Sequence, residues 1–137
     1  MPDSPVKLRL PATSGYLVLA RTAVAALCAR LDYPLDRLED AKLAVNEACS
    51  LLLADAREGS ELDIDMTSDD DGLLSVTLRA HTQHGRPPKQ TSFAWTVLSA
   101  LVDSVTASAS NDTVTITLQA SRGTTPAPIG ETDLVGS

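Results

Sequence analysis

The sequence is short of several features, and each shortage excludes a class of protein. No apolar run approaches the roughly 20 residues that a membrane-spanning helix needs. Residues 1–9 are polar with scattered prolines and lack the apolar core of a signal peptide. Basic residues number 11 against 18 acidic ones, for a net charge of −7, and they are scattered along the chain. We therefore expect a cytoplasmic protein with no membrane partner and no direct nucleic-acid binding, because the latter needs a clustered basic face.

Cysteine and histidine are also scarce, and their spacing predicts no metal site. Cys28 and Cys49 lie far apart without CxxC spacing, so we expect two buried core residues, with a redox pair as the alternative. His81 and His84 fall in a predicted loop with no third ligand nearby, whereas zinc sites use three or four protein ligands. The run Asp69–Gly72 lacks the alternating carboxylates and distal glutamate of a calcium loop, so we expect a hairpin turn there.

Apolar periodicity predicts eight elements of secondary structure. Alternating apolar residues predict strands at 6–10, 61–67, 73–80, 105–109 and 113–119. Apolar residues at helical spacing predict helices at 16–31, 36–54 and 92–102. Asp36 is the expected N-cap of the second helix, because Glu39 follows three residues later in a capping-box arrangement.

The order of these elements, β-α-α-β-β-α-β-β, predicts the fold class. It is typical of an α+β fold, a two-layer sandwich of a mixed β-sheet with helices on one face. The chain of 137 residues is 43% hydrophobic, which is enough for one domain with an ordinary core. We expect this domain to span residues 1–120 and the remainder, residues 121–137, to form a disordered tail, because it is rich in Gly, Thr and Pro.

The segment Ala41–Leu51 is the most informative part of the chain. It resembles the nucleotide-site helix of an ATP-dependent protein kinase. Glu47 stands where such a helix carries its catalytic carboxylate, and Leu51 lies one helical turn later on the same face. Leu51 stands where an amide oxygen would reach magnesium, and a leucine cannot coordinate a hard cation that requires oxygen ligands.

With this segment, residues 20–27, residues 97–103 and the element order over residues 8–119 resemble the bacterial anti-sigma factors related to serine-protein kinases. These belong to the wider family of histidine-kinase-like ATPase domains. The resemblance implies a homodimer that holds an RNA polymerase sigma factor away from polymerase during a stress response. It also implies partner switching, in which a STAS-domain anti-sigma antagonist competes for the protein and releases the sigma factor. Active members phosphorylate a serine of that antagonist with ATP and magnesium.

Most positions that hold nucleotide in this family are changed here. Leu51 replaces the metal-binding asparagine, and Ala80 lies where the adenine-binding aspartate is expected. The glycines that open the last helix have become Ser92 and Ala94, and the expected ATP lid at 81–91 is short. Only Glu47 remains, as a relic of the catalytic carboxylate.

These changes predict a pseudokinase with no cofactor and no metal. Each lost charge-assisted contact costs about 1.5–3 kcal/mol, so four losses remove most useful nucleotide affinity. We therefore expect an anti-sigma factor that acts without ATP binding or kinase activity. Two alternatives stay open: a working serine kinase that phosphorylates its STAS antagonist, and a heterodimer partner of an active paralogue.

Arg21 interrupts the edge of the apolar stripe in the first predicted helix. In the resembled family the arginine at this position contacts both sigma factor and antagonist, since a guanidinium can fork a carboxylate on either partner. The resemblance therefore implies that Arg21 binds partners, together with Leu17 and Val24 of the same helix. The alternative is an ordinary solvated arginine.

Phe93 and Trp95 are the only Phe and Trp in the chain. They lie beside the changed glycine positions at the start of the last predicted helix. One interpretation is ordinary core packing. The other is that both side chains fill the vacated nucleotide pocket, so that the fold stays compact without a ligand.

Overall fold

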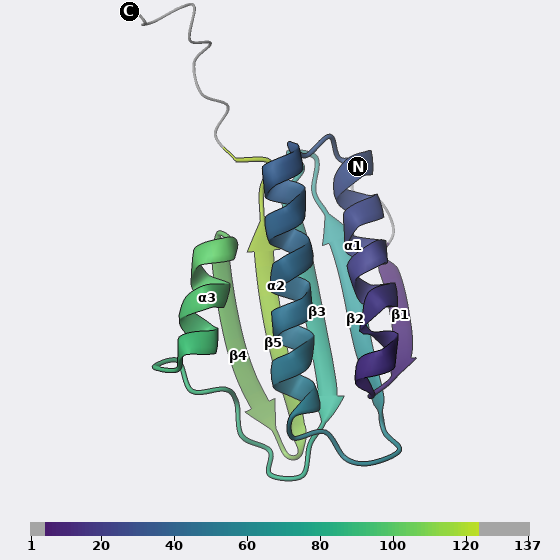
Figure 1. The fold of residues 1–137 in the computed structure, drawn as a ribbon, viewed down its shortest axis with the longest axis vertical. Coiled ribbons are helices and arrows are strands. Elements are labelled where there is room, and N and C mark those ends of the chain that lie inside the picture. The colour runs from purple at the N-terminus through teal and green to yellow at the C-terminus, as the bar shows by residue number, and fades with distance from the viewer. Residues whose placement is uncertain (1–4, 124–137) are drawn as a thin grey trace, which may run out of the picture.

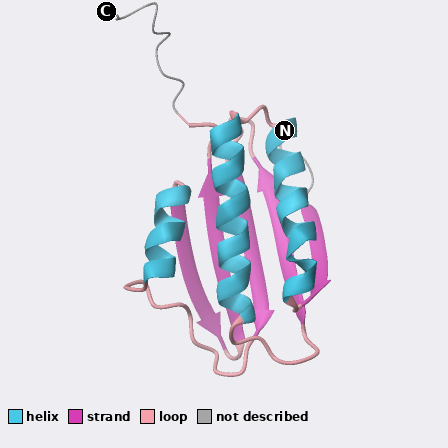
Figure 2. Ribbon diagram, in the orientation of Figure 1, coloured by secondary structure: helices cyan, strands magenta, loops and turns pink. Residues whose placement is uncertain are grey.

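The computed structural model describes residues 5–123 and confirms the predicted element order. Five strands form one sheet, and three helices cover one of its faces (Figures 1 and 2). The strands are β1 (Val6–Pro11), β2 (Glu61–Ser68), β3 (Leu74–His81), β4 (Ser104–Ser110) and β5 (Thr113–Ala120). The helices are α1 (Leu17–Arg30), α2 (Leu35–Leu53) and α3 (Phe93–Leu101), and a short 3-10 turn, η1 (Ser14–Tyr16), leads into α1. The α+β sandwich is therefore confirmed.

The sheet is antiparallel throughout, so the prediction of a mixed sheet is wrong. Its strand order is β1-β2-β3-β5-β4. The single helix α3 returns the chain so that β3 and β4 run in the same direction (Figure 1). These two strands do not pair, because β5 lies between them and is antiparallel to both. The helical hairpin α1–α2 likewise brings β2 back antiparallel to β1.

Strict alternation along the inner strands decides which residues form the core. On β3, Val76 is buried, and its neighbours across the sheet are Met66 on β2 and Leu118 on β5. The intervening residues, such as Thr77 and Thr117, lie on the uncovered face. Because successive side chains of a strand point to opposite faces, the apolar set lies under the helices and the polar set faces water. Each fully buried aliphatic side chain contributes about 1.5–3 kcal/mol.

Helix α2 begins earlier than its capping-box pattern predicts. Pro34 is the N-cap, with an extended backbone, so the prediction of Asp36 as N-cap is wrong. Asp36 instead lies in the first turn, where one of its carboxylate oxygens accepts a hydrogen bond from the backbone N–H of Arg37 at 2.8 Å. A carboxylate in the first turn still favours the helix, because the unpaired N–H groups there carry partial positive charge.

The end of β5 is fastened to the connection between α1 and α2. The Tyr33 hydroxyl lies 2.6 Å from the carbonyl oxygen of Ala120 and 2.7 Å from that of Gly72. Arg37 donates from Nε to the carbonyl oxygen of Ser121 at 3.0 Å. The predicted domain boundary at residue 121 therefore falls inside a bonded segment, and residues 124–137 of the predicted tail lie outside the described residues.

No helix within residues 5–123 has both the length and the hydropathy that crossing a membrane would require.

Candidate functional site

Helix α1 carries apolar side chains on more than its core face. Val24, in the core stripe, is 0% exposed, yet Tyr16, Val18 and Leu19 at the start of the helix are all more than 40% exposed. The outer face of a surface helix is normally polar. Several exposed apolar side chains next to one another indicate a surface that contacts another protein.

Arg21 lies beside this apolar surface and is held in place by α2. Its Nη1 donates a hydrogen bond to Oδ1 of Asn46 at 2.6 Å, and the arginine is half-buried between the two helices. A guanidinium has five N–H donors in a fixed plane. The bond to Asn46 therefore fixes the orientation of the plane and leaves donors that could engage a carboxylate of a partner.

A shallow groove of 440 Å³ runs along α1 and α2 at this point. Its residues combine both charges with one exposed leucine: Arg21, Glu39, Asp40, Lys42, Leu43 and Asn46. Leu43 is 46% exposed, and Lys42 Nζ lies 3.6 Å from a carboxylate oxygen of Glu39. An apolar centre with charged neighbours resembles the surfaces at which proteins recognise one another. We take the outer face of α1 and α2, with Arg21 at its centre, as the candidate site and call it the α1–α2 face.

Two of the three predicted binding residues do not belong to this face. Leu17 is 5% exposed and Val24 is 0% exposed, because both lie in the core stripe of α1. A partner that binds this structure cannot touch them directly. Val18 and Leu19 are exposed in their place. The sequence already indicates an exposed apolar residue in the run Leu17–Ala20, since four consecutive apolar residues cannot all face one side of a helix.

The residues of the changed nucleotide site occupy α2, α3 and β3. Glu47 and Leu51 are half-buried on α2, and Leu51 packs against the core. Ala80 is buried within β3, opposite Leu62 on the neighbouring strand. Ser92 is the N-cap of α3, and its Oγ accepts a hydrogen bond from the backbone N–H of Trp95 at 3.2 Å. Ala94 is half-buried in the first turn of α3.

The two large aromatic residues at the start of α3 have opposite environments. Trp95 is 6% exposed and belongs to the core, as expected from both interpretations of this residue. Phe93 is 83% exposed, so the prediction that it packs in the core or fills a vacated pocket is wrong. Residues two apart on a helix point about 200° away from each other, and therefore only one of the pair can face the sheet.

The loop that replaces the expected ATP lid is tied to its surroundings. His84 Nδ1 lies 2.6 Å from Oδ1 of Asp55, and the His84 backbone N–H donates to the other carboxylate oxygen at 3.1 Å. The side-chain hydrogen bond with His84 holds the pKa of Asp55 below its ordinary value. On the other side, the Thr82 hydroxyl donates to the carbonyl oxygen of Asp112 at 2.9 Å, and Arg57 pairs with the Asp112 carboxylate. These contacts fix the start of the loop to the end of α2 and to the β4–β5 turn.

The histidines and the acidic turn have ordinary structural partners. His81 Nδ1 lies 3.4 Å from the Thr113 hydroxyl, whereas His84 contacts Asp55. The predicted hairpin turn is confirmed, because Asp69 Oδ1 accepts hydrogen bonds from the backbone N–H groups of Asp71 and Leu73, each at 2.9 Å. Among residues 5–123, no three His, Cys, Asp or Glu residues are grouped in a way that could hold a metal ion.

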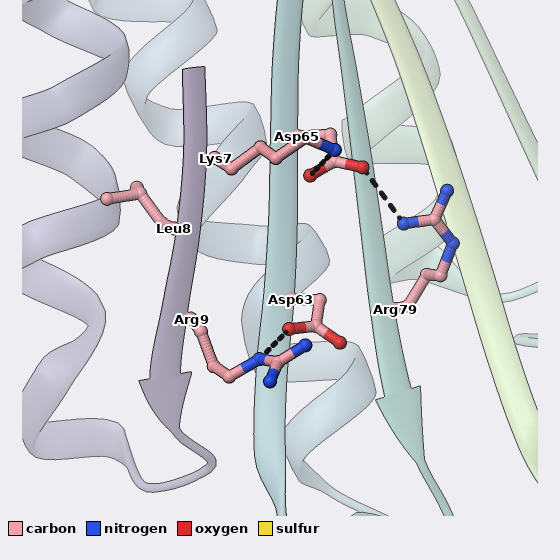
Figure 3. Close-up of a pocket in the computed structure, with 6 residues that line it drawn as sticks. All are labelled: Lys7, Leu8, Arg9, Asp63, Asp65 and Arg79. Atoms are coloured by element: carbon pink, nitrogen blue, oxygen red, sulfur yellow. Dashed lines mark hydrogen bonds and ion pairs between the residues drawn. The ribbon is translucent and has the colours of Figure 1, made fainter. Parts of the chain in front are cut away.

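A second hollow, of 460 Å³, lies on the uncovered face of the sheet near β1 (Figure 3). Arg9 Nε lies 2.8 Å from Oδ1 of Asp63, Arg79 Nη1 lies 3.1 Å from Oδ2 of Asp65, and Lys7 Nζ lies 3.6 Å from Oδ1 of Asp65. Each of these cations already lies against a carboxylate. Such exposed pairs contribute little to stability, and the lining holds three cations against two carboxylates, so its net charge is small.

Both cysteines are buried, as the sequence predicts, and neither forms a disulfide. Burial raises the pKa of Cys28 to about 11 and that of Cys49 to about 12. A thiolate is the reactive form of cysteine, and almost none is present near neutral pH at such pKa values.

We expect neither thiol to react in the native protein with a thiol-specific chromogenic reagent at pH 8. Unfolding in denaturant should release both thiols to the reagent. The measurement is the absorbance of the released chromophore before and after unfolding. Labelling of Cys28 or Cys49 in the native state would instead support the redox alternative.

Comparisons with known proteins bear on the fold. No family model and no curated protein matches the sequence. Among solved structures, the chain is similar to the crystal structure of the RsbU and RsbW domains of Rv1364c from Mycobacterium tuberculosis, with a TM-score of 0.70 and 15% identity. The match covers 87% of this chain and 32% of that one. The chain has the histidine-kinase-like ATPase fold. Because this chain spans about a third of its structural neighbour, the likeness concerns one domain only.

Proposed function

We propose that this protein is an anti-sigma factor of the partner-switching type that acts without ATP binding or kinase activity. Its α1–α2 face would sequester an alternative RNA polymerase sigma factor, and a STAS-domain antagonist would compete for the same face. The observation that carries the proposal is Arg21, oriented by Asn46 at 2.6 Å next to exposed apolar residues. The RsbW-like fold supports it further.

The chemistry of the α1–α2 face suits competition between two partners. The guanidinium of Arg21 can form a bidentate contact with a carboxylate, while Val18 of α1 and Leu43 of α2 offer exposed apolar area. Both proposed partners would use the same arginine, so binding of one excludes the other. Release of the sigma factor then depends on the concentrations and affinities of the two partners, and no covalent step is needed.

The net charge of −7 favours this kind of partner. Sigma factors are often basic where they contact DNA and polymerase, and opposite charges accelerate association. The proposal places the protein in the cytoplasm, where sigma factors act.

The proposal is tested by transcription in vitro. The purified protein should inhibit transcription by polymerase that carries one alternative sigma factor of the same organism. This inhibition should need no prior incubation of the protein with ATP. Addition of the cognate unphosphorylated STAS protein should restore transcription. Failure to bind any sigma factor of the organism in a pull-down panel would contradict the proposal.

We expect calorimetric titration with magnesium–ATP to produce no binding heat, even at protein concentrations that reveal millimolar affinity. The physical reason is that Leu51 offers no oxygen ligand to magnesium and Ala80 no carboxylate to adenine. Incubation with labelled ATP should leave the STAS protein unphosphorylated. Binding of the STAS protein in the same cell serves as the control that the sample is active.

Millimolar or tighter ATP affinity with phosphate transfer to the STAS protein would favour the alternative of a serine kinase. Glu47 would then be its catalytic carboxylate. Mixed dimers with an active paralogue, without sigma-factor binding, would favour the heterodimer alternative.

A further inference from the structure

The connection between β3 and α3, residues 82–92, is positively charged although the protein as a whole is acidic. Residues 73–102 contain no Asp or Glu, whereas the chain has 18 of them. Arg86 and Lys89 lie in the connection, and both are exposed. A segment without carboxylates creates a region of positive potential on an otherwise negative surface. Such a region favours a ligand of negative charge.

Arg86 and Lys89 are available to a partner. Within the described part of the chain, neither side chain forms a hydrogen bond or a close ion pair. The charge of Arg86 contributes to the lowered pKa of Asp55, after the larger contribution of the hydrogen bond from His84. That carboxylate is already occupied by the His84 ring at 2.6 Å. An acidic group of another protein could therefore approach both cations without displacing an existing partner.

The base of the connection is fixed, so the two cations are presented from an ordered backbone. The backbone N–H of Gly85 donates to the Thr82 hydroxyl at 2.9 Å. Gly85 has a φ of +61°, and a Cβ there would lie 2.5 Å from the carbonyl oxygen of Asn111, so only glycine fits this approach. Pro87 and Pro88 follow Arg86, and each proline ring fixes its own φ. A segment that is already ordered loses less entropy when it binds.

Helix α3 adds an apolar side chain next to these cations. Its sequence, Phe-Ala-Trp-Thr-Val-Leu-Ser-Ala-Leu, contains no charged residue. Phe93 begins the helix directly after the connection, and it is 83% exposed. Aromatic residues and arginine are enriched where proteins bind one another. We call Arg86, Lys89 and Phe93 the basic patch.

The basic patch and the α1–α2 face are near the same end of the molecule. The connection between β3 and α3 crosses the end of the helix layer at which α1 begins and α2 ends (Figure 1). Arg21 lies in the second turn of α1, towards that end. A partner that binds Arg21 and extends across the end of α2 would reach the basic patch, whereas a partner centred on α1 would not.

We propose that the basic patch is a second contact for the STAS antagonist alone, which would bind it through an acidic segment that also packs an apolar side chain on Phe93. The inference rests on the proposed function, in which both partners use Arg21. The sigma factor is the partner whose contact surface is expected to be basic, so the patch repels it and favours its acidic competitor. The basic patch then determines which partner the protein prefers. Two cations on a protein of net charge −7 are too few for nucleic acid or an anionic membrane.

The first test compares the affinities of both partners for a variant without the two charges. Arg86→Gln, Lys89→Gln should weaken binding of the STAS antagonist about tenfold. Binding of the sigma factor should stay within about twofold of wild type or become slightly tighter, because a repulsive charge has been removed. The matched control is Lys7→Gln, Arg9→Gln, which removes two exposed positive charges from β1. It should leave both affinities within about twofold.

The second test concerns the apolar part of the patch. Phe93→Ala should weaken binding of the antagonist about tenfold, because truncation of an aromatic side chain in an interface loses a large contact. It should leave binding of the sigma factor unchanged. Phe93→Leu keeps apolar area, so its affinity for the antagonist should fall between those of wild type and Phe93→Ala. Far-UV circular dichroism of each variant checks that it is folded.

Transcription in vitro provides a functional measurement of the same selectivity. The Arg86→Gln, Lys89→Gln variant should inhibit transcription as fully as wild type. Relief of that inhibition should need about ten times more antagonist, in proportion to the lost affinity. Arg21→Ala should differ, because it weakens both inhibition and relief.

Three results would overturn the inference. If the variants of the basic patch bind both partners as wild type does, the inference fails and the proposed function stands. If they lose both partners equally, or lose the sigma factor alone, the patch does not select the antagonist. If the wild-type protein binds neither partner, the proposed function fails and this inference fails with it.

Discussion

Arg21→Ala is expected to weaken binding of the sigma factor about 10- to 100-fold. A hydrogen bond to a charged group contributes about 1.5–3 kcal/mol, and each 1.4 kcal/mol corresponds to about a tenfold change in affinity. The same substitution should weaken binding of the STAS antagonist, because the proposal gives both partners the same guanidinium. Surface plasmon resonance with each immobilised partner measures the two effects separately.

Two control variants make the Arg21 result specific. Arg21→Lys keeps the charge but loses the planar fork, so its affinity should fall between those of wild type and Arg21→Ala. Arg30→Ala removes an exposed arginine nine residues further along the same helix, and it should leave both affinities within about twofold. Unchanged affinity in Arg21→Ala would remove Arg21 from the proposed site.

Trp95→Ala is expected to lower the free energy of unfolding by about 3–5 kcal/mol, since the deletion of a buried aromatic side chain loses contacts and leaves a cavity. A domain of this kind has about 5–15 kcal/mol of stability in total. Trp95 is 6% exposed in the core, so the change should be among the largest that a single residue can produce. Denaturant unfolding followed by far-UV circular dichroism measures it, because the variant has no tryptophan fluorescence.

Phe93→Ala is the matched control, because it deletes a similar aromatic ring from the same turn of α3. With its side chain 83% exposed, Phe93 should change stability by no more than about 0.5 kcal/mol. A comparable loss of stability in the two variants would mean that Phe93 is buried in solution.

The sequence predicts the elements of this fold well and their pairing poorly. Strands such as residues 61–67 alternate strictly, and alternation follows directly from the two faces of a strand. The pairing of strands depends on where the chain returns after each helix, which a local pattern does not contain. The insertion of β5 between β3 and β4, and with it the antiparallel sheet, could not be read from periodicity.

In the candidate site, too, the sequence predicts local features better than contacts between distant segments. The resemblance points to Arg21, but the contact of Arg21 with Asn46 joins residues 25 positions apart and depends on how α1 and α2 align. The resemblance also implies a partner surface at Leu17 and Val24, but both belong to the apolar stripe of the same helix, which packs in the core. Phe93 and Trp95 differ because a helix can turn only one of them toward the sheet.

The place of β5 in the sheet has a consequence for how the protein is made. Strand β5, the last of the described strands in chain order, occupies an interior position, where it pairs with β3 on one side and β4 on the other. Until residues near 120 have emerged, β3 and β4 have no common partner and the apolar face beneath α2 and α3 stays incomplete. A nascent chain can form the α1–α2 hairpin early, because that contact is local. It can complete its core only after β5 has emerged, so chains that stop before β5 should expose apolar surface and be prone to aggregation and degradation.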